Sequence, residues 1–241
     1  MRADLIDPVL VRPGRKGDAR GIRAPGIRAA RTHRCSVDAP PREAPYAQDS
    51  LPDRDAAETL EVFYPYQRLL EAGYEVHIGA PEKKKLQFVV HDFVDGFDTY
   101  TEKVGHTWDA DVAFADVDPA DYVAIVVPGG RAPEYIRNDE DAKRIVRHFF
   151  EKNAPVAALC HGPMLLAAAG VLTGRTSSAY PALAIDVELG GGIFEDGAGV
   201  VDGNLVSGRA WPDHPTWMRE FMKLLAASDA TRPEPLLEAV N

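Results

Sequence analysis

Two adjacent residues, Cys160 and His161, form the strongest chemical signal in the sequence. They follow the apolar run Val156–Leu159, and a helical pattern begins directly after them, so a buried strand is expected to turn into a helix at the thiol. A nucleophile at such a junction is typical of a nucleophile elbow. The sharp reversal requires small residues two positions before and after the nucleophile, and Ala158 and Gly162 meet that requirement. The alternative is a structural cysteine, because free cysteines are among the most buried residue types.

The chemistry that this pair favours is attack by a thiolate on an electrophilic carbon. A helix N-terminus carries partial positive charge, so the start of the following helix is expected to lower the pKa of the Cys160 thiol. The imidazole of His161 can accept a proton from the thiol when a carboxylate orients it. Without that carboxylate, His161 is a capping or surface histidine. The carboxylate has to come from another part of the chain.

Helices and strands alternate along the chain on both sides of this turn and must position it. The spacing of apolar residues predicts helices over about 60–70, 139–152 and 162–169, and strands over 74–78, 122–127 and 155–159. Strands that are apolar throughout have no solvent face, so they predict a mostly parallel sheet covered by helices on both sides. The Cys160 turn then lies at the carboxyl end of a central strand, where open α/β sheets bind their ligands.

The 241 residues divide into a head, one domain and a tail. We expect the domain over residues 55–228, with its far edge formed by segments at 177–180, 183–189, 192–195, 205–207 and 215–227. Residues 1–54 contain many prolines and show no periodicity of 2 or 3.6, which predicts a disordered head. Residues 229–241 are expected to form a solvated tail.

The charge distribution narrows the possible partners. The formal net charge is −10, and residues 1–34 contain nine Lys or Arg against three Asp, so the head is +6 and the remainder −16. A globular part that acidic repels a polyphosphate backbone, which argues against nucleic acid as a partner. No apolar run approaches the ~18–20 residues of a membrane span. Two cysteines in unlike contexts favour a cytoplasmic protein without disulfides or zinc, and we expect no cofactor and no metal.

Several motifs agree in order and spacing with one known family. Segments 126–134, 158–163, 170–175, 180–181 and 201–206 closely resemble the ThiJ/PfpI family of the class I glutamine amidotransferase-like superfamily, in particular its PfpI-type intracellular proteases and general stress proteins. The resemblance spans about residues 55–225. It implies a flavodoxin-like α/β fold, a three-layer α/β/α sandwich with a mostly parallel sheet. It also implies a cysteine nucleophile at Cys160 within a Cys–His–Glu arrangement.

The resemblance assigns roles to further residues. It implies that Glu134 of a neighbouring subunit orients His161 in a homo-oligomer, either a dimer or a hexamer; in the alternative reading Glu134 only complements a helix dipole. The amides of Gly130 and His161 are expected to form an oxyanion hole. Glu61 aligns with a glutamate beside the thiol, where an ionised carboxylate raises the pKa of the cysteine and a protonated one donates a hydrogen bond to the thiolate. Glu58 is expected to contribute to the start of the same helix.

The chain departs from the family just before the Glu61 helix. Family members have an apolar central strand there, whereas residues 49–54 are polar and Pro52 removes a hydrogen-bond donor that a central strand needs. We therefore expect the first strand of the sheet to be missing or replaced. A shifted reading frame or a wrongly chosen start upstream of Asp55 is one hypothesis for this abrupt change.

Two classes of function follow. The leading one is a cysteine-dependent hydrolase or lyase in stress response, acting as a peptidase, a protein deglycase or a glyoxalase-like enzyme on a peptide or small carbonyl substrate. The alternative is a non-catalytic redox-sensing or chaperone-like stress protein in which Cys160 is oxidised. A glutaminase is disfavoured because Thr216 stands where those enzymes have the glutamate of a His-Pro-Glu motif. Loops at Tyr180, Arg209 and Trp211 are expected to border the pocket.

Overall fold

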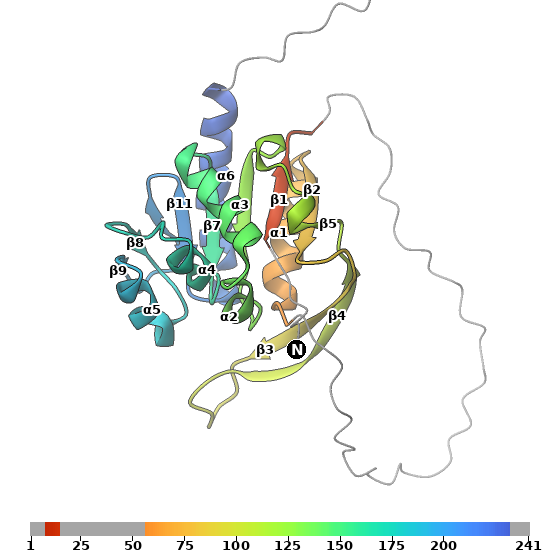
Figure 1. The fold of residues 1–241 in the computed structure, drawn as a ribbon. Coiled ribbons are helices and arrows are strands. Elements are labelled where there is room, and N and C mark those ends of the chain that lie inside the picture. The colour runs from red at the N-terminus through yellow and green to blue at the C-terminus, as the bar shows by residue number, and fades with distance from the viewer. Residues whose placement is uncertain (1–7, 15–55, 232–241) are drawn as a thin grey trace, which may run out of the picture. The chain divides into compact units, whose positions relative to one another are not determined.

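A seven-stranded sheet forms the centre of the computed structural model, which describes residues 8–14 and 56–231 (Figure 1). Its strand order is β10-β11-β7-β6-β1-β2-β5. The neighbours β11, β7 and β6 run parallel, as do β2 and β5 at the far side. The strands are β1 (Val9–Arg12), β2 (Glu75–Ala80), β5 (Val112–Ala113), β6 (Ala124–Val127), β7 (Val156–Leu159), β10 (Val200–Asp202) and β11 (Leu205–Gly208).

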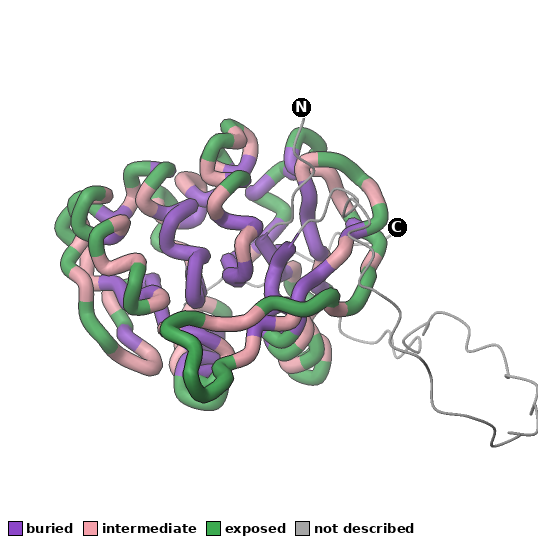
Figure 2. The backbone as a smooth tube through the Cα atoms, turned by 90° about the horizontal axis from the view of Figure 1, so that it is seen from below, coloured by how far each residue is buried: buried purple, intermediate pink, exposed green. Residues whose placement is uncertain are grey.

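Helices cover both faces of this sheet, which gives the three expected layers. Side chains of α1 and α6 pack on one face together with Val126 and Ala157, and side chains of α3 and α4 pack on the other together with Ile125 and Val156. Successive residues of one strand thus enter opposite layers, as the pleat requires. Figure 2 shows that the buried segments lie in the interior, and every residue of β6, β7 and β11 is buried. The helices are α1 (Thr59–Glu71), α2 (Pro133–Ile136), α3 (Glu140–Glu151), α4 (Pro163–Ala168), α5 (Ala184–Leu189) and α6 (His214–Thr231).

Most elements that carry the apolar pattern agree with the sequence-based prediction. Helices α3 and α4 and strands β6 and β7 begin and end within two residues of the expected positions. Helix α6 differs, because it continues to Thr231, and Asp229 accepts a hydrogen bond from the Tyr74 hydroxyl. The boundary expected at residue 228 is therefore wrong, and the described helix includes the first three residues of the expected tail.

Strand β1 corrects the interpretation of residues 1–54 as a head without structure. Val9, Leu10 and Val11 are fully buried, and the strand pairs antiparallel with both β2 and β6 at the centre of the sheet. Arg12 closes the strand with an ion pair of 3.0 Å to Asp121. The first strand is thus replaced rather than missing: a strand of opposite direction, far earlier in the sequence, fills its position. Residues 1–7 and 15–54 of the predicted head lie outside the described residues.

A long hairpin beside the sheet was not predicted from the sequence. Strands β3 (Lys85–Asp92) and β4 (Thr101–Asp109) pair antiparallel with a bulge between Gln87 and Val89, and they form the yellow hairpin in Figure 1. Its base packs on α1, where the ring of Phe63 meets Phe88 and Trp108 edge-on. A smaller parallel pair consists of β8 (Thr176–Ser177) and β9 (Ile193–Phe194).

Candidate active site

The turn between β7 and α4 has the backbone geometry of a nucleophile elbow. Cys160 adopts φ +56°, a left-handed conformation that is strained for a residue with a side chain. The prediction of a small residue at position 162 is confirmed in physical terms, because a Cβ on Gly162 would lie 2.3 Å from the carbonyl oxygen of Val127. Cys160 is a free cysteine with 3% exposure. The chain thus bends sharply at the carboxyl end of a central strand and holds the thiol there.

His161 lies against the thiol. Its Nδ1 is 3.2 Å from Sγ of Cys160. Burial, and to a lesser extent the nearby His91, lower the pKa of His161 to about 4, so the imidazole is neutral at neutral pH and can accept a proton. The ring of Tyr180 stacks on the imidazole at 5.6 Å, and the ring of Tyr100 meets it edge-on at 5.8 Å. These two tyrosines hold the imidazole in place.

Glu134 reaches the opposite side of the imidazole. Its Oε1 is 4.0 Å from Nε2 of His161 within one chain, which is longer than a hydrogen bond. The carboxylate thus approaches His161 from within the same chain, whereas the resemblance implies a glutamate from a neighbouring subunit. Burial raises the pKa of Glu134, while Arg131 and Arg137 oppose that change. The shared site itself stays a prediction.

Backbone N–H groups surround the sulfur of Cys160. Those of Gly130 and His161, the two expected oxyanion-hole donors, act to lower the pKa of the Cys160 thiol. Gly130 has φ +76°, and a Cβ there would lie 2.4 Å from the backbone nitrogen of Glu58. Only glycine therefore lets the loop after β6 approach both α1 and the thiol. A carbonyl oxygen next to Sγ would lie near the same donors.

Glu61 lies beneath the thiol on the first turn of α1. Its Oε2 accepts a hydrogen bond of 2.7 Å from the N–H of Gly129, and the carboxyl group acts on the pKa of the Cys160 thiol. A Cβ on Gly129 would lie 2.5 Å from the Cβ of Cys160, so the absence of a side chain permits this contact. Burial, followed by the charge of Glu58, raises the pKa of Glu61 well above its ordinary value.

The direction of the thiol pKa differs from the sequence-based expectation. Burial, followed by the field of Glu61, raises the pKa of Cys160 well above its ordinary value, and the two N–H groups only partly oppose this. The expected effect of the helix N-terminus does not prevail, because α4 spans just six residues and the sulfur is almost completely desolvated. The resting thiol is therefore protonated.

Four residues of a neighbouring network were missed by the sequence analysis. Arg131 donates two hydrogen bonds, of 2.6 and 2.8 Å, to the carboxylate of Glu102 on β4. The same carboxylate lies 3.0 Å from Nε2 of His91 on β3, and the His91 ring stacks on Tyr100. This network fastens the hairpin to the loop that carries Gly130. No local signal identifies it, because its members come from three separate segments.

The loops expected to border the pocket lie near the site. Tyr180 and Arg209 line a cavity of about 220 Å³ together with Phe93 of the hairpin connection. Arg209 is held by Asp213 and Asp196. The indole nitrogen of Trp211 donates to the carbonyl of His91, and the backbone of Trp211 acts to lower the pKa of the Glu61 carboxyl.

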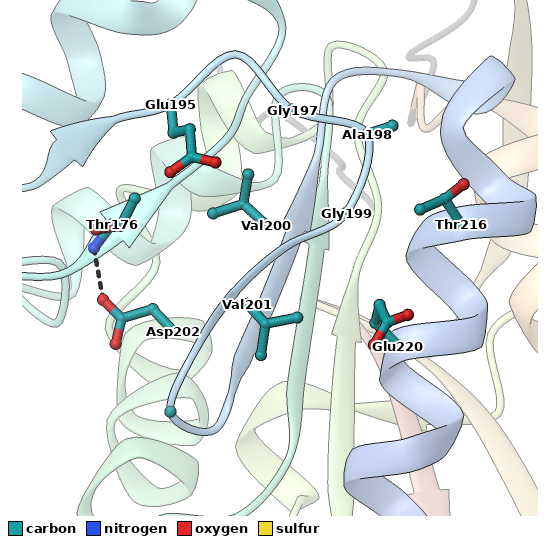
Figure 3. A pocket seen from close by; sticks show the side chains of 11 residues that line it. Thr176, Glu195, Gly197, Ala198, Gly199, Val200, Val201, Asp202, Thr216 and Glu220 are labelled. Carbon is teal, nitrogen blue, oxygen red and sulfur yellow. Dashed lines mark hydrogen bonds between the residues drawn. The ribbon is translucent and has the colours of Figure 1, made fainter.

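A second cavity, of about 710 Å³, is remote from this chemistry (Figure 3). Glu195, Asp202 and Glu220 line it together with the glycines of the loop before β10, and neither Cys160 nor His161 contributes to it. Within residues 8–14 and 56–231, no group of three or more His, Cys, Asp or Glu residues is placed to hold a metal ion. In the same ranges, no helix is long and apolar enough to cross a membrane.

Comparison with known proteins gives a consistent result. The model of the DJ-1/PfpI family matches residues 52–224. Protein DJ-1 homolog D from Arabidopsis thaliana is 44% identical over 178 residues, which cover 71% of this chain and 46% of that protein, so the chain spans about half of that relative's length. A deglycase from Thermococcus kodakarensis is 42% identical over 171 residues, covering 71% of this chain and 95% of the relative. A solved two-domain protein from Anabaena variabilis, with DJ-1/ThiJ/PfpI-like and ferritin-like domains, has a TM-score of 0.58 and 27% identity, covering 76% of this chain and 49% of that one.

Proposed function

The chain belongs to the DJ-1/PfpI family, and from that premise we propose that it is a cysteine-dependent deglycase acting in stress response. The observation that carries the proposal is the 3.2 Å contact between Sγ of Cys160 and Nδ1 of a neutral His161, at a turn where two N–H groups face the sulfur. The choice of a deglycase among the cysteine hydrolases is supported by the names of relatives about 42% identical to this chain.

The first chemical step is addition of the thiol to a carbonyl carbon. His161 takes the proton of Cys160 through Nδ1, a bond forms between sulfur and carbon, and the π electron pair of the carbonyl moves to its oxygen. The N–H groups of Gly130 and His161 stabilise the resulting oxyanion. The imidazolium then holds the proton that a departing amine requires. Glu134 is proposed to orient the imidazole during this transfer.

The same addition serves a peptidase or a glyoxalase-like enzyme, so the leaving group distinguishes the activities. In a deglycase the substrate is a carbinolamine, in which the carbon that carries the amine lies next to the carbonyl that Cys160 attacks. The carbinolamine hydroxyl loses its proton and becomes a carbonyl, the C–N bond breaks, and the amine leaves with the proton held by His161. Water then releases the carbon fragment from the sulfur as a hydroxy acid, which frees the thiol. The substrate we propose is therefore a peptide whose amino or guanidino group carries an adduct of a small dicarbonyl. Rings of Tyr100 and Tyr180 flank the place where such an adduct meets His161.

We also propose that the active form is a homo-oligomer in which Glu134 completes a neighbouring site. The own-chain distance of 4.0 Å is too long for a hydrogen bond to His161, so a closer carboxylate has to come from movement or from a second chain. Mixing inactive Cys160→Ala and inactive Glu134→Ala subunits is expected to restore part of the activity. If subunits exchange and no activity returns, the own-chain carboxylate orients His161.

The decisive experiment compares release of the free peptide from a methylglyoxal-treated peptide by three proteins. Cys160→Ala is expected to lose activity by about a thousandfold or more. Cys35→Ala removes the other cysteine of the chain and is expected to keep the wild-type rate. Wild-type turnover by Cys160→Ala would overturn the proposal.

A further inference from the structure

Two cavities meet at Tyr180, the residue whose ring stacks on His161. One, of about 220 Å³, is lined by Phe93, Pro181 and the loop after β11. The other, of about 290 Å³, is lined by the hairpin connection over residues 93–99. Phe93 and Tyr180 belong to the walls of both. The ring centroids of Tyr180 and His161 are 5.6 Å apart, so the cavities begin about one side chain away from the imidazole that is proposed to take the thiol proton.

Aromatic rings form much of these walls. Phe93 and Phe97 of the hairpin connection are exposed by 47% and 64%. The ring of Phe93 lies 6.0 Å from that of Trp211, which supports it from the loop after β11. The hydroxyl groups of Tyr180 and Thr99 lie within hydrogen-bond distance, 3.2 Å, and join Tyr180 to the hairpin. Rings held in this way offer faces to a long apolar stem and to a cation at its end.

The charged groups around the walls are mostly acidic. Asp95 and Asp98 line the larger cavity, and Asp213 lines the smaller one. Among the described residues that line the two cavities, Arg209 is the only cation. Its guanidinium donates two hydrogen bonds of 2.9 Å to Asp213 and one of 3.0 Å to Asp196, so its charge is already balanced. An incoming cation is therefore attracted to this region, and an incoming carboxylate is repelled.

The position of the cavities fits a neighbour of the reacting residue in a peptide. Neither Cys160 nor His161 lines them, so they lie beside the reacting centre and leave it free for the adduct. Successive residues of an extended chain are about 3.3–3.6 Å apart, so a long side chain one or two positions from the glycated residue reaches past Tyr180. The walls are continuous with the site through that ring.

We propose that the two cavities form one subsite for a lysine or arginine side chain of the peptide, one or two positions from the glycated residue. The stem of this side chain lies against the rings of Phe93 and Tyr180, and its cationic end lies near Asp95 and Asp98. The inference rests on the proposed function in taking a peptide as the substrate. It makes the hairpin connection the part of the chain that selects among glycated peptides.

The test compares three acetylated peptides that carry one lysine for glycation and differ in the next residue. That residue is trimethyllysine, which has no N–H for methylglyoxal to modify, norleucine, which has a similar stem without charge, or glutamate. Fluorescence anisotropy gives the Kd of each untreated peptide for the wild-type protein. Trimethyllysine is expected to bind about tenfold more tightly than glutamate, with norleucine between them. Its advantage over norleucine should shrink as NaCl rises from about 50 mM to about 1 M, because salt screens exposed charges. After methylglyoxal treatment, kcat/KM for peptide release should follow the same order.

Variants of the subsite are read through the ratio of two Kd values in one protein, which does not depend on the folded fraction. In the double variant Asp95→Asn/Asp98→Asn, the advantage of trimethyllysine over norleucine should disappear. Phe93→Leu keeps an apolar wall but removes the ring, so the same advantage should fall about threefold. Asp116→Asn and Leu189→Ala, exposed residues that line neither cavity, are the controls and should keep the wild-type ratio.

Three results would overturn the inference: equal Kd values for the trimethyllysine and norleucine peptides, tighter binding of the glutamate peptide, or an unchanged ratio in both subsite variants. The absence of measurable binding by the trimethyllysine peptide would also overturn it. The expected order of Kd values without release of peptide from the glycated forms contradicts the proposed function alone. Release from all three glycated peptides at equal kcat/KM, with equal Kd values, contradicts the subsite alone.

Discussion

The turn at Cys160 and strand β1 both lie at the centre of the sheet and are both buried, but their origins in the sequence differ. The turn is specified within residues 156–163, by an apolar strand, a thiol and small flanking residues. Strand β1 depends on partners far along the chain, since Val9 pairs with Ile78 on one side and with Val126 on the other. Local sequence therefore specifies the chemistry of this molecule, whereas distant pairing specifies part of its scaffold.

The same contrast separates the elbow from the hairpin above it. The residues that hold His161 in its buried setting include Tyr100 and Tyr180, which lie 80 positions apart in the sequence. Glu102 on β4 and Arg131 in the loop after β6 form a hydrogen-bonded pair in the neighbouring network. Substitutions in the turn should thus change chemistry with little loss of stability, and substitutions in the scaffold should do the reverse.

The largest expected effect is a loss of turnover caused by a substitution in the turn at Cys160. His161→Ala removes the group that takes the proton of Cys160, so turnover of a glycated peptide should fall by about 10²–10⁴-fold. The midpoint of thermal unfolding should change little, because the imidazole accepts no buried backbone donor. His148→Ala on α3 is the control and should keep wild-type turnover. Full turnover by His161→Ala would show that the contact with Sγ has no role in the reaction.

The next effect falls on strand β1. Leu10 is fully buried in the layer that contains α3 and α4, so Leu10→Ala should lower the free energy of unfolding by about 2–5 kcal/mol. Turnover per folded molecule should remain. Val201→Ala on β10, where the side chain is about half exposed, is the control and should cost less than ~0.5 kcal/mol. Equal denaturation midpoints for Leu10→Ala and the wild type would contradict the place of β1 in the sheet.

A smaller effect, on kcat, is expected from the Glu102–Arg131 pair that joins the hairpin to the site. Glu102→Gln weakens the two hydrogen bonds from Arg131 and loosens the hairpin above His161, so kcat should fall about tenfold through poorer orientation. Alkylation of Cys160 should be unchanged, since the thiol and Glu61 are untouched. Glu140→Gln, which removes an exposed pair with Lys143, is the control. Equal kcat values for the two variants would show that the hairpin does not orient the site.

The smallest effect concerns the charge of His161. Its folded-state pKa of about 4 lies below the ordinary value of about 6.5, so on acidification the unfolded chain takes up the proton first. The stability that the neutral imidazole contributes is therefore lost as the pH falls from 6.5 towards 4. The NMR signal of its ring, assigned with His161→Gln, should not titrate between pH 5.5 and pH 8. A midpoint near 6.5 would mean that the rings of Tyr100 and Tyr180 do not bury the His161 imidazole.

Particular residues show what the sequence could and could not predict. The strand before Cys160 and the helix over 140–151 have strong periodicity, so their positions followed from spacing alone. Strand β1 has only four residues in a segment of prolines, glycines and arginines, and burial by distant neighbours outweighs that composition. The structure places His161 and Glu61 beside Cys160, and Glu134 of the same chain 4.0 Å from His161, while their roles stay predictions. The direction of the thiol pKa differs from the expectation. Desolvation depends on packing around the sulfur, which no local pattern reports.

The central claim is that Cys160 is the nucleophile, and titration with iodoacetamide tests it most directly. Wild-type protein is treated with increasing substoichiometric amounts at pH 8, and each sample is divided for two measurements. Mass spectrometry gives the alkylated fraction of Cys160 and of Cys35, and release of free peptide gives the remaining activity. Activity is expected to fall in proportion to the alkylated fraction of Cys160, whatever the fraction of Cys35, and to extrapolate to zero at complete modification of Cys160. Activity that persists with Cys160 fully alkylated, or that follows Cys35 instead, would contradict it.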